Sequence, residues 1–254
     1  MRKNLMKARL QEGRPIIGFT LLAYWPDAID ILGLLGVDYV MIDGEHGAVG
    51  RPEVAGLVRA CESAGITPVV RVSSNSPDQI LGYLDAGAQA IVIPNVSSKE
   101  DAERAVTACK YWPVGRRGCG YGHALDWLIR QPFSEYIKDA NEEVMVCPMI
   151  ESKEGLENVE EIVNVPGVDS IWPGPADLAQ SLGVAGQMNH PVLLDALERI
   201  KRVTVAAGKY ICGGATDGDA ARNAFQEGYH IVNYGVHRFL IAGVRDYVTK
   251  ARAG

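Results

Sequence analysis

The chain has 254 residues, of which 47% are hydrophobic and 22% are charged. This length and composition fit a folded protein with one large or two small domains and exclude disordered, collagen-like and fibrous classes. Its 25 Lys and Arg residues against 31 Asp and Glu residues give a net charge of −6. There is no basic excess to neutralise the phosphates of a nucleic acid, so a nucleic-acid partner is not expected.

Signals for a membrane or an oxidising compartment are missing from the sequence. No apolar run approaches the roughly 20 residues that a membrane-spanning helix needs. Residues Met1–Lys7 read as the basic start of a polar helix, and no apolar signal segment follows them. The five cysteines form no C-x-x-C pair and are interpreted as buried, inert thiols rather than as disulfide or zinc ligands. We therefore expect a cytoplasmic protein.

Short apolar segments alternate with helical patterns along the whole chain. The apolar segments are rich in Val, Ile or Tyr and nearly continuous, which is typical of parallel strands buried on both faces. The expected strands are Ile16–Leu22, Tyr39–Asp43, Pro68–Val72, Ala90–Pro94, Val144–Ile150, Ser170–Trp172, Tyr210–Cys212 and Ile231–Tyr234. The expected helices are Asp27–Leu35, Pro52–Ala64, Pro77–Ala86, Ser98–Lys110, Gly155–Val163, Pro191–Ala207, Asp217–Glu227 and Phe239–Arg252.

This alternation of strand and helix requires a parallel sheet with right-handed crossovers. Eight such units in about 250 residues match an α/β fold of the (β/α)8 or TIM-barrel type. An open doubly wound sheet is the alternative, but no G-x-G-x-x-G follows the first strand. No linker composition marks a boundary, so we expect a single barrel domain over residues 1–254.

One connection, Tyr111–Glu143, is long and contains the glycine-rich stretch Gly115–Gly122. The stretch does not run from a strand through a loop into a helix, as a phosphate-binding loop must. We interpret the connection as a mobile lid or an interface loop.

Ionisable side chains follow several of the expected strands at their carboxyl ends, where the active sites of barrels lie. The second strand leads into Asp43–Gly47, which includes His46, and the third ends at Arg71. The fifth strand leads to Glu151, and the sixth leads into Gly174–Asp177. Because unpaired buried charge is costly, this convergence of charges indicates a functional site.

Glu151 and Asp177 come from neighbouring strands without a Cys or His companion. Ligation by oxygen alone suits a hard divalent ion such as Mg²⁺ or Mn²⁺ and would leave most of an octahedron for substrate and water. Asp177 could instead cap the helical turn that follows it. The spacing alone does not decide between these two interpretations.

The remaining candidates each have a structural and a functional interpretation. His46 could be a hydrogen-bonded rim histidine or a general base. Arg71 lies in a buried strand and must meet an anion, either a carboxylate side chain or a substrate. Asp85 lies at the end of a helix, where an acidic side chain is more often a solvated surface residue than a catalytic partner. All lysines fall on helices, loops or strand beginnings, so a Schiff-base mechanism is not expected.

Taken together, these motifs resemble those of the metal-dependent class II pyruvate aldolases, the HpcH/HpaI aldolase family. The resemblance runs from Gly18 to about Val248. It rests on Asp43–Gly47, Arg71, Leu84–Ala88 leading into Ile93-Pro94, Pro113–Gly118, Ile150–Ser152 and Gly174–Gly183.

The resemblance implies an aldolase that releases pyruvate and an aldehyde from a 4-hydroxy-2-oxoacid. It implies that Glu151 and Asp177 hold a divalent metal ion (Mg²⁺, Mn²⁺ or Co²⁺) and that Arg71 stabilises the pyruvate enolate. It implies that His46, made more basic by Asp85, moves the proton of the aldol hydroxyl.

The resemblance also implies how the substrate is received and how the chain assembles. The pyruvate carboxylate would meet the backbone of Gly174, Pro175, Ala176 and Asp177. Members of the family are typically hexamers that exchange C-terminal helices. Here the segment Phe239–Arg252 carries Leu240, Ile241, Val244 and Val248 on one face, which needs a docking surface on its own barrel or on another subunit.

One position departs from the family pattern. Met149 stands where members commonly carry a Gln that contacts the substrate, and Met cannot donate a strong hydrogen bond. This change leaves open a different aldehyde or a different donor such as hydroxypyruvate. It also leaves open decarboxylation of a β-ketoacid such as oxaloacetate, or an enolate condensation like that of macrophomate synthase. A non-catalytic metabolite-binding barrel is a further alternative.

Overall fold

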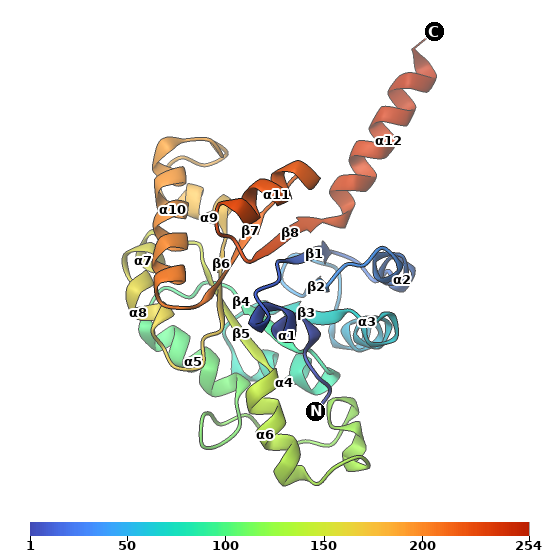
Figure 1. Cartoon of the computed structure of the whole chain (residues 1–254), viewed down its shortest axis with the longest axis vertical. Coiled ribbons are helices and arrows are strands. Elements are labelled where there is room, and N and C mark those ends of the chain that lie inside the picture. The colour runs from blue at the N-terminus through green and yellow to red at the C-terminus, as the bar shows by residue number, and fades with distance from the viewer. Residues whose placement is uncertain (254) are drawn as a thin grey trace.

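Eight parallel strands close into a barrel in the computed structural model, which describes residues 1–253 (Figure 1). The strands follow chain order around the barrel, and β8 pairs with β1. They are β1 (Ile16–Leu21), β2 (Tyr39–Asp43), β3 (Thr67–Arg71), β4 (Ala90–Ile93), β5 (Met145–Ile150), β6 (Ser170–Pro173), β7 (Tyr210–Gly214) and β8 (Ile231–Gly235). The predicted TIM-barrel fold is confirmed, and no strand end differs from its prediction by more than two residues.

The chain also forms helices, most of which surround the barrel on its outside (Figure 1). They are α1 (Leu5–Gln11), α2 (Pro26–Leu34), α3 (Arg51–Ala64), α4 (Pro77–Ala86), α5 (Lys99–Cys109), α6 (Phe133–Glu143), α7 (Lys153–Glu157), α8 (Val159–Val163), α9 (Pro175–Ser181), α10 (Pro191–Ala206), α11 (Gly218–Gln226) and α12 (Val236–Arg252), with a 3₁₀ helix η1 (His123–Leu128). None of these helices within residues 1–253 combines the length and apolar character that a membrane crossing requires.

The hydrophobic core has two layers. One fills the interior of the barrel and includes Tyr39, Val69, Met145 and Trp172. The other lies between the strands and the surrounding helices. Helix α1 contributes Met6 to the interior layer, which places this helix across the amino end of the barrel. The interior is therefore open to solvent at the carboxyl ends of the strands.

The long connection between β4 and β5 is more ordered than the expected lid or loop. It contains η1 and α6, and a separate apolar cluster of Tyr111, Phe133 and Tyr136 holds it together. The expectation of a single helix over Gly155–Val163 was also wrong, because the chain forms two short helices that meet at Asn158. Of the five cysteines, four are buried as expected, whereas Cys119 is exposed.

Helix α12 leaves the barrel and extends away from it (Figure 1). Only its beginning packs, where the Phe239 ring contacts the edges of Phe19 and Tyr234 at centroid distances of 5.5 and 5.2 Å. None of its residues is buried within the described chain. The apolar face predicted for this segment therefore does not dock on its own barrel.

Candidate active site

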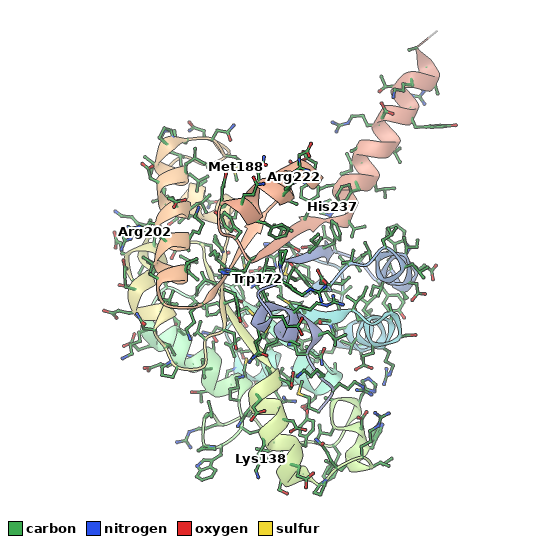
Figure 2. All side chains as sticks on the ribbon, in the orientation of Figure 1. Lys138, Trp172, Met188, Arg202, Arg222 and His237 are labelled. Atoms are coloured by element: carbon green, nitrogen blue, oxygen red, sulfur yellow. The ribbon has the colours of Figure 1, made fainter. Side chains whose placement is uncertain are left out.

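A cavity of about 630 Å³ opens at the carboxyl ends of the strands. Asp43, His46, Arg71 and Met149 line it, together with residues 174–177. Trp172, labelled near the centre of the barrel in Figure 2, also lines this cavity. The structure thus brings most of the sequence-predicted site residues to one place, on the expected side of the barrel.

Asp43 and Arg71, which both line this cavity, form an ion pair. Parallel pairing of β2 and β3 sets the two residues directly opposite each other at the strand ends. Asp43 is fully buried, and both of its carboxylate oxygens accept hydrogen bonds from Arg71, Oδ1 from Nε at 3.0 Å and Oδ2 from Nη2. Asp43 Oδ1 also accepts from the backbone N–H groups of Glu45 and His46, each at 3.1 Å. One carboxylate therefore fixes both the guanidinium and the loop after β2.

The charge states of this pair follow from the contact. Burial alone would raise the pKa of Asp43, but the hydrogen bonds and positive charge of Arg71 outweigh it and lower the pKa. Burial would lower the pKa of Arg71, and Asp43 reverses this effect so that the pKa of Arg71 is raised. Both side chains are therefore ionised at neutral pH.

Glu45 connects the ion pair to His46. Its Oε2 lies 3.3 Å from Arg71 Nη1 and 3.8 Å from His46 Nε2. Burial raises the pKa of Glu45, although the charges of Arg71 and His46 act against it. The His46 side chain itself is 64% exposed at the mouth of the cavity. Glu45, which lies within the motif Asp43–Gly47, is therefore the carboxylate that faces the His46 ring.

Glu151 is buried, with 6% of its surface exposed. Its Oε1 accepts a hydrogen bond from the backbone N–H of Asn95 at 2.6 Å. Burial raises the pKa of Glu151, the hydrogen bond from Asn95 lowers it, and the nearby charges of Glu45 and Asp177 raise it further. The side chain packs against Gly174, where a Cβ atom would lie 2.6 Å from Glu151 Cβ. Glycine at this position lets the carboxylate approach the beginning of α9.

Asp177 is the third residue of α9, and the N-cap of that helix is Gly174. The interpretation of Asp177 as an N-cap is therefore wrong. Within residues 1–253 the Asp177 carboxylate has no hydrogen-bonding or ion-pair partner, and it lines the cavity. It remains available to a ligand.

The carboxylates at this end of the barrel fit a hard cation. Negative charge from neighbouring carboxylates raises the pKa of Glu45 and of Glu151 beyond the effect of burial, and the Arg71 guanidinium is already paired with Asp43 and Glu45. No cluster of three or more His, Cys, Asp and Glu ligands occurs in the described part of the chain. Glu151 and Asp177 offer carboxylate oxygen alone, which is the donor chemistry that an oxygen-preferring divalent ion takes.

Asp85 does not join the other site residues. It sits at the end of α4 and does not line the cavity, and its Oδ1 accepts from Arg117 Nη2 at 3.0 Å. The reason is topological: each helix runs back from the carboxyl to the amino end of the barrel, so the last turn of α4 lies far from the strand ends. The His46–Asp85 pair that the resemblance implies is therefore not formed within one copy of the chain.

The structure adds residues that sequence reasoning missed. Asn233 on β8 and His237 and Arg238 at the start of α12 line the cavity. Asn233 Nδ2 donates to Thr20 Oγ1 at 2.8 Å across the β1–β8 seam. The signal for His237 and Arg238 is their position just past the carboxyl end of the eighth strand, whereas Asn233 lies within that strand.

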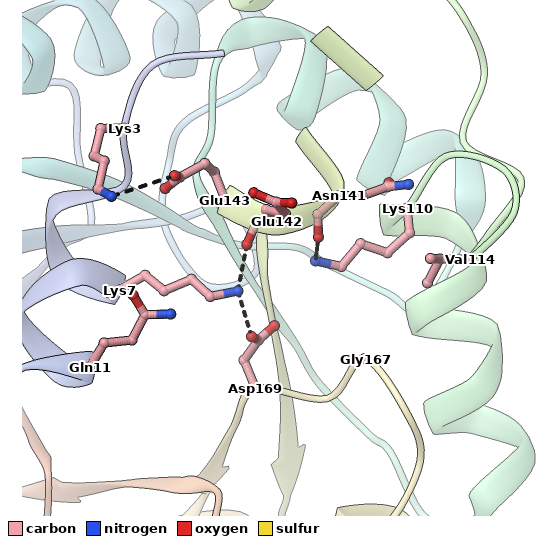
Figure 3. A pocket seen from close by; sticks show the side chains of 10 residues that line it. All are labelled: Lys3, Lys7, Gln11, Lys110, Val114, Asn141, Glu142, Glu143, Gly167 and Asp169. Carbon is pink, nitrogen blue, oxygen red and sulfur yellow. Dashed lines mark hydrogen bonds and ion pairs between the residues drawn. The ribbon is translucent and has the colours of Figure 1, made fainter. Parts of the chain in front are cut away.

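A second cavity, of about 450 Å³, lies at the amino end of the barrel and is rich in lysine (Figure 3). Lys110 is buried there, and burial lowers its pKa. Its Nζ donates to the backbone carbonyls of Asn141, at 2.8 Å, and Val144, while Lys7 Nζ pairs with Asp169 Oδ1 at 2.9 Å. These ammonium groups are held by their own chain, at the opposite end from Glu151 and Asp177.

Comparison with known proteins gives consistent results. Residues 17–242 match the family described as HpcH/HpaI aldolase/citrate lyase. Over 209 residues the chain is 37% identical to 4-hydroxy-2-oxo-heptane-1,7-dioate aldolase from Salmonella dublin, covering 82% of this chain and 78% of that protein. Over 211 residues it is 36% identical to hydroxypyruvate/pyruvate aldolase from Sagittula stellata, covering 81% and 82%. A crystal structure of an HpcH/HpaI aldolase/citrate lyase family protein from Burkholderia cenocepacia superposes with a TM-score of 0.91 at 32% identity, covering 99% and 100%.

The Asp43–Arg71 pair predicts a measurable loss of stability. Asp43→Asn keeps the shape of the side chain but leaves the Arg71 guanidinium buried without its main counter-charge, so we expect the free energy of unfolding to fall by about 3 kcal/mol at pH 7. Urea denaturation measures this loss. Asp219→Asn, which breaks an exposed ion pair with Arg222, is the control and should have a much smaller effect.

The difference in unfolding free energy between wild type and Asp43→Asn should depend on pH. Because the folded state lowers the pKa of Asp43, its contribution is present above the ordinary carboxyl pKa of about 4 and is lost as the pH falls through the lowered value. The difference between wild type and Asp43→Asn should therefore be constant from about pH 5 to 7 and shrink below about pH 4. A difference that grows on acidification would contradict this assignment.

Proposed function

The chain belongs to the HpcH/HpaI aldolase/citrate lyase family and is a class II aldolase, a carbon–carbon lyase, and we propose that it reversibly cleaves a 4-hydroxy-2-oxoacid into a 2-oxoacid and an aldehyde. Pyruvate, or a related 2-oxoacid such as hydroxypyruvate, is the proposed donor. The observation that carries the proposal is the meeting of Arg71, His46, Glu151 and Asp177 at one end of the barrel.

The proposed cofactor is a divalent metal ion, Mg²⁺, Mn²⁺ or Co²⁺, with Glu151 and Asp177 as its protein ligands. The fit rests on two oxygen donors, of which Glu151 is buried: burial raises the pKa of Glu151, and the charges of Glu45 and Asp177 raise it further. Such an ion, when bound, offsets the negative charge that cleavage leaves on the former ketone oxygen.

Arg71 contributes a second, fixed positive charge. Asp43 holds its guanidinium through two hydrogen bonds and raises its pKa, so the group stays cationic and oriented throughout turnover. Charge that is already in place when the enolate develops stabilises it without reorganisation. The backbone of Gly174, Pro175, Ala176 and Asp177, where no side chain caps α9, is the proposed receptor of the substrate carboxylate.

His46 is the proposed base for the aldol hydroxyl. It lines the cavity, is accessible, and its Nε2 has the Glu45 carboxylate 3.8 Å away. Aldol cleavage requires removal of that hydroxyl proton as the carbon–carbon bond breaks, and an imidazole has a suitable pKa. Asp85 lies at the other end of its own barrel, so any effect of Asp85 on His46 must come from a second copy of the chain.

We propose a homo-oligomer, a hexamer, in which α12 docks on a neighbouring copy. Support comes from the apolar face of α12, which includes Leu240, Ile241 and Val244 and which its own barrel leaves uncovered. Leu34 at the end of α2 and Leu35 at its C-cap are also exposed and form an apolar surface of matching character. Burying both surfaces is the expected gain on assembly.

A cytoplasmic location is proposed from the cysteine chemistry. All five thiols are free, and the burial of four of them raises the pKa of each, so they stay protonated and inert in a reducing compartment.

Decarboxylation of a β-ketoacid such as oxaloacetate is the second candidate. It would form the same enolate and use the same Arg71 and metal ligands, but it has no hydroxyl to deprotonate. The dependence of the two reactions on His46 therefore separates them.

The metal assignment predicts loss of binding as well as of turnover. Glu151→Gln and Asp177→Asn should each weaken Mn²⁺ binding, measured by calorimetry on chelator-treated protein, and abolish pyruvate release. The matched control is Glu154→Gln, an exposed carboxylate on α7 three residues from Glu151. Full activity of exhaustively chelated enzyme would contradict the proposal.

The base assignment predicts a selective defect. His46→Ala should lower kcat/KM for aldol cleavage by about 10²–10⁴-fold and lower oxaloacetate decarboxylation much less. Arg71→Lys, which loses the two-pronged contact with Asp43, should impair both reactions. His190→Ala, at the N-cap of α10, is the control. Equal losses in both reactions for His46→Ala would show that His46 organises the site rather than moving the proton.

The assembly proposal predicts a size change. The double variant Leu240→Glu/Val244→Glu should reduce the mass measured by light scattering from that of six chains to a smaller species, because two charges replace the apolar docking face. Thr249→Glu, on an exposed polar position of α12, should leave the mass unchanged. A monomeric wild type at micromolar concentration would rule the hexamer out.

A further inference from the structure

Two uncharged polar side chains, Thr20 of β1 and Asn233 of β8, line the cavity where these two strands meet. Thr20 is buried, with 7% of its surface exposed. Side chains that line the cavity from other strands are apolar: Met41, Val92 and Trp172 belong to the hydrophobic core of the barrel interior. A polar pair among such side chains is costly unless its hydrogen-bonding groups find partners.

Tyr39 of β2 fixes the orientation of this pair from the amino-end side. In the strand register, Gly18 of β1 lies between Tyr39 and Asn233. A Cβ atom on Gly18 would collide with the Tyr39 ring, so glycine at this position lets the ring cross β1 toward β8. The buried Tyr39 hydroxyl donates to the Val232 carbonyl at 3.1 Å and lies 3.3 Å from Asn233 Oδ1. The Asn233 amide therefore turns its Oδ1 toward Tyr39 and its Nδ2 toward Thr20.

The hydrogen bond within the pair leaves donors unused. Asn233 Nδ2 donates to Thr20 Oγ1 at 2.8 Å, so the Thr20 hydroxyl is the acceptor in this contact. Within residues 1–253, neither the Thr20 hydroxyl proton nor the second hydrogen of Asn233 Nδ2 has an acceptor. Because the fold holds both side chains in place at the cavity, these donors are available to an oxygen atom of a ligand.

The pair lies across the barrel from the proposed metal site. The strands follow chain order around the barrel, so β1 lies opposite β5, which leads to Glu151 (Figure 1). His46 follows β2, the strand next to β1. A substrate that is anchored at Glu151 and extends across the cavity therefore meets Thr20 and Asn233.

We infer that Thr20 and Asn233 are specificity-determining residues that bind a hydroxyl group of the substrate. This inference rests on the proposed function. Both side chains are uncharged and therefore match a neutral oxygen, whereas a carboxylate or a phosphate would lose more hydration than two neutral donors return. The hydroxyl belongs either to the 2-oxoacid half, as in hydroxypyruvate, or to the aldehyde half, and the experiment separates these two sources.

The kinetic test uses two pairs of compounds in which a hydroxyl group replaces a methyl group. Hydroxypyruvate and 2-oxobutanoate are compared as donors in the aldol addition to propanal, and glycolaldehyde and propanal are compared as acceptors of pyruvate. Wild type should prefer the hydroxylated member of one pair, which identifies the half that carries the hydroxyl. Thr20→Val keeps the shape of the side chain but removes its hydroxyl, so it should lower that ratio of kcat/KM values by about tenfold. Thr20→Ser should retain the ratio.

The matched control is Thr67→Val. Thr67 is a buried threonine on β3 whose Oγ1 accepts a hydrogen bond from the Met6 backbone N–H at 3.0 Å, and it does not line the cavity. Both substitutions remove a hydrogen bond from the fold, and a ratio of two substrates does not depend on the fraction of folded enzyme. Thr67→Val should therefore keep the wild-type ratio. An equal fall for Thr67→Val, an unchanged ratio for Thr20→Val, or a wild type without preference in either pair would overturn the inference.

A binding test keeps the inference separate from the aldolase proposal. Hydroxypyruvate, 2-oxobutanoate, glycolaldehyde and propanal are each added singly to Mg²⁺-loaded protein and observed by saturation-transfer NMR, which detects weak ligands and needs no turnover. Stronger binding of a hydroxylated compound than of its methyl counterpart, lost in Thr20→Val, supports the inference even if no pair is turned over, and the proposed function alone would then fail. Turnover in which wild type and Thr20→Val bind and use both members of each pair alike would overturn the inference and leave the aldolase proposal standing.

Discussion

The buried contact between Asp43 and Arg71 is the constraint on which the site depends. Parallel register between β2 and β3 places the two residues side by side, and the burial of Asp43 makes each ion require the other. The same carboxylate holds the backbone of Glu45 and His46, so the loop after β2 cannot move independently of the guanidinium. An interaction within the fold thereby sets the position of a candidate base and of a fixed cation together.

Further carboxylates lie around that pair at the carboxyl ends of the strands. Glu151 and Asp177 concentrate negative charge at β5 and α9, where it is unfavourable unless a cation joins them. His237 and Arg238 also line the cavity, at the beginning of α12. On the proposed function, a divalent ion held by Glu151 and Asp177 would offset the negative charge between them.

Much of this arrangement could be predicted from the sequence because barrel strands are continuous apolar runs and their carboxyl ends define the site. Arg71 and Asp177 were found in this way. Asp85 could not be placed, because a spatial relation to His46 depends on which way α4 runs and on how copies assemble. Helix α6 carries apolar residues at helical spacing, Phe133, Tyr136 and Ala140, but they follow a glycine-rich stretch that suggested a loop. His237 and Arg238 fell between a strand predicted to end at Tyr234 and a helix predicted to begin at Phe239.

The closure of the barrel's amino end by α1 has a kinetic consequence. Because Met6 of α1 packs in the interior core, the barrel is closed at its amino end. Substrates and products must therefore enter and leave at the carboxyl ends of the strands. On the proposed function, the 2-oxoacid would lie beside the buried Glu151, and the aldehyde would lie between it and the opening of the cavity. In cleavage the aldehyde would then have to leave before the 2-oxoacid. In the synthetic direction the 2-oxoacid would have to bind before the aldehyde.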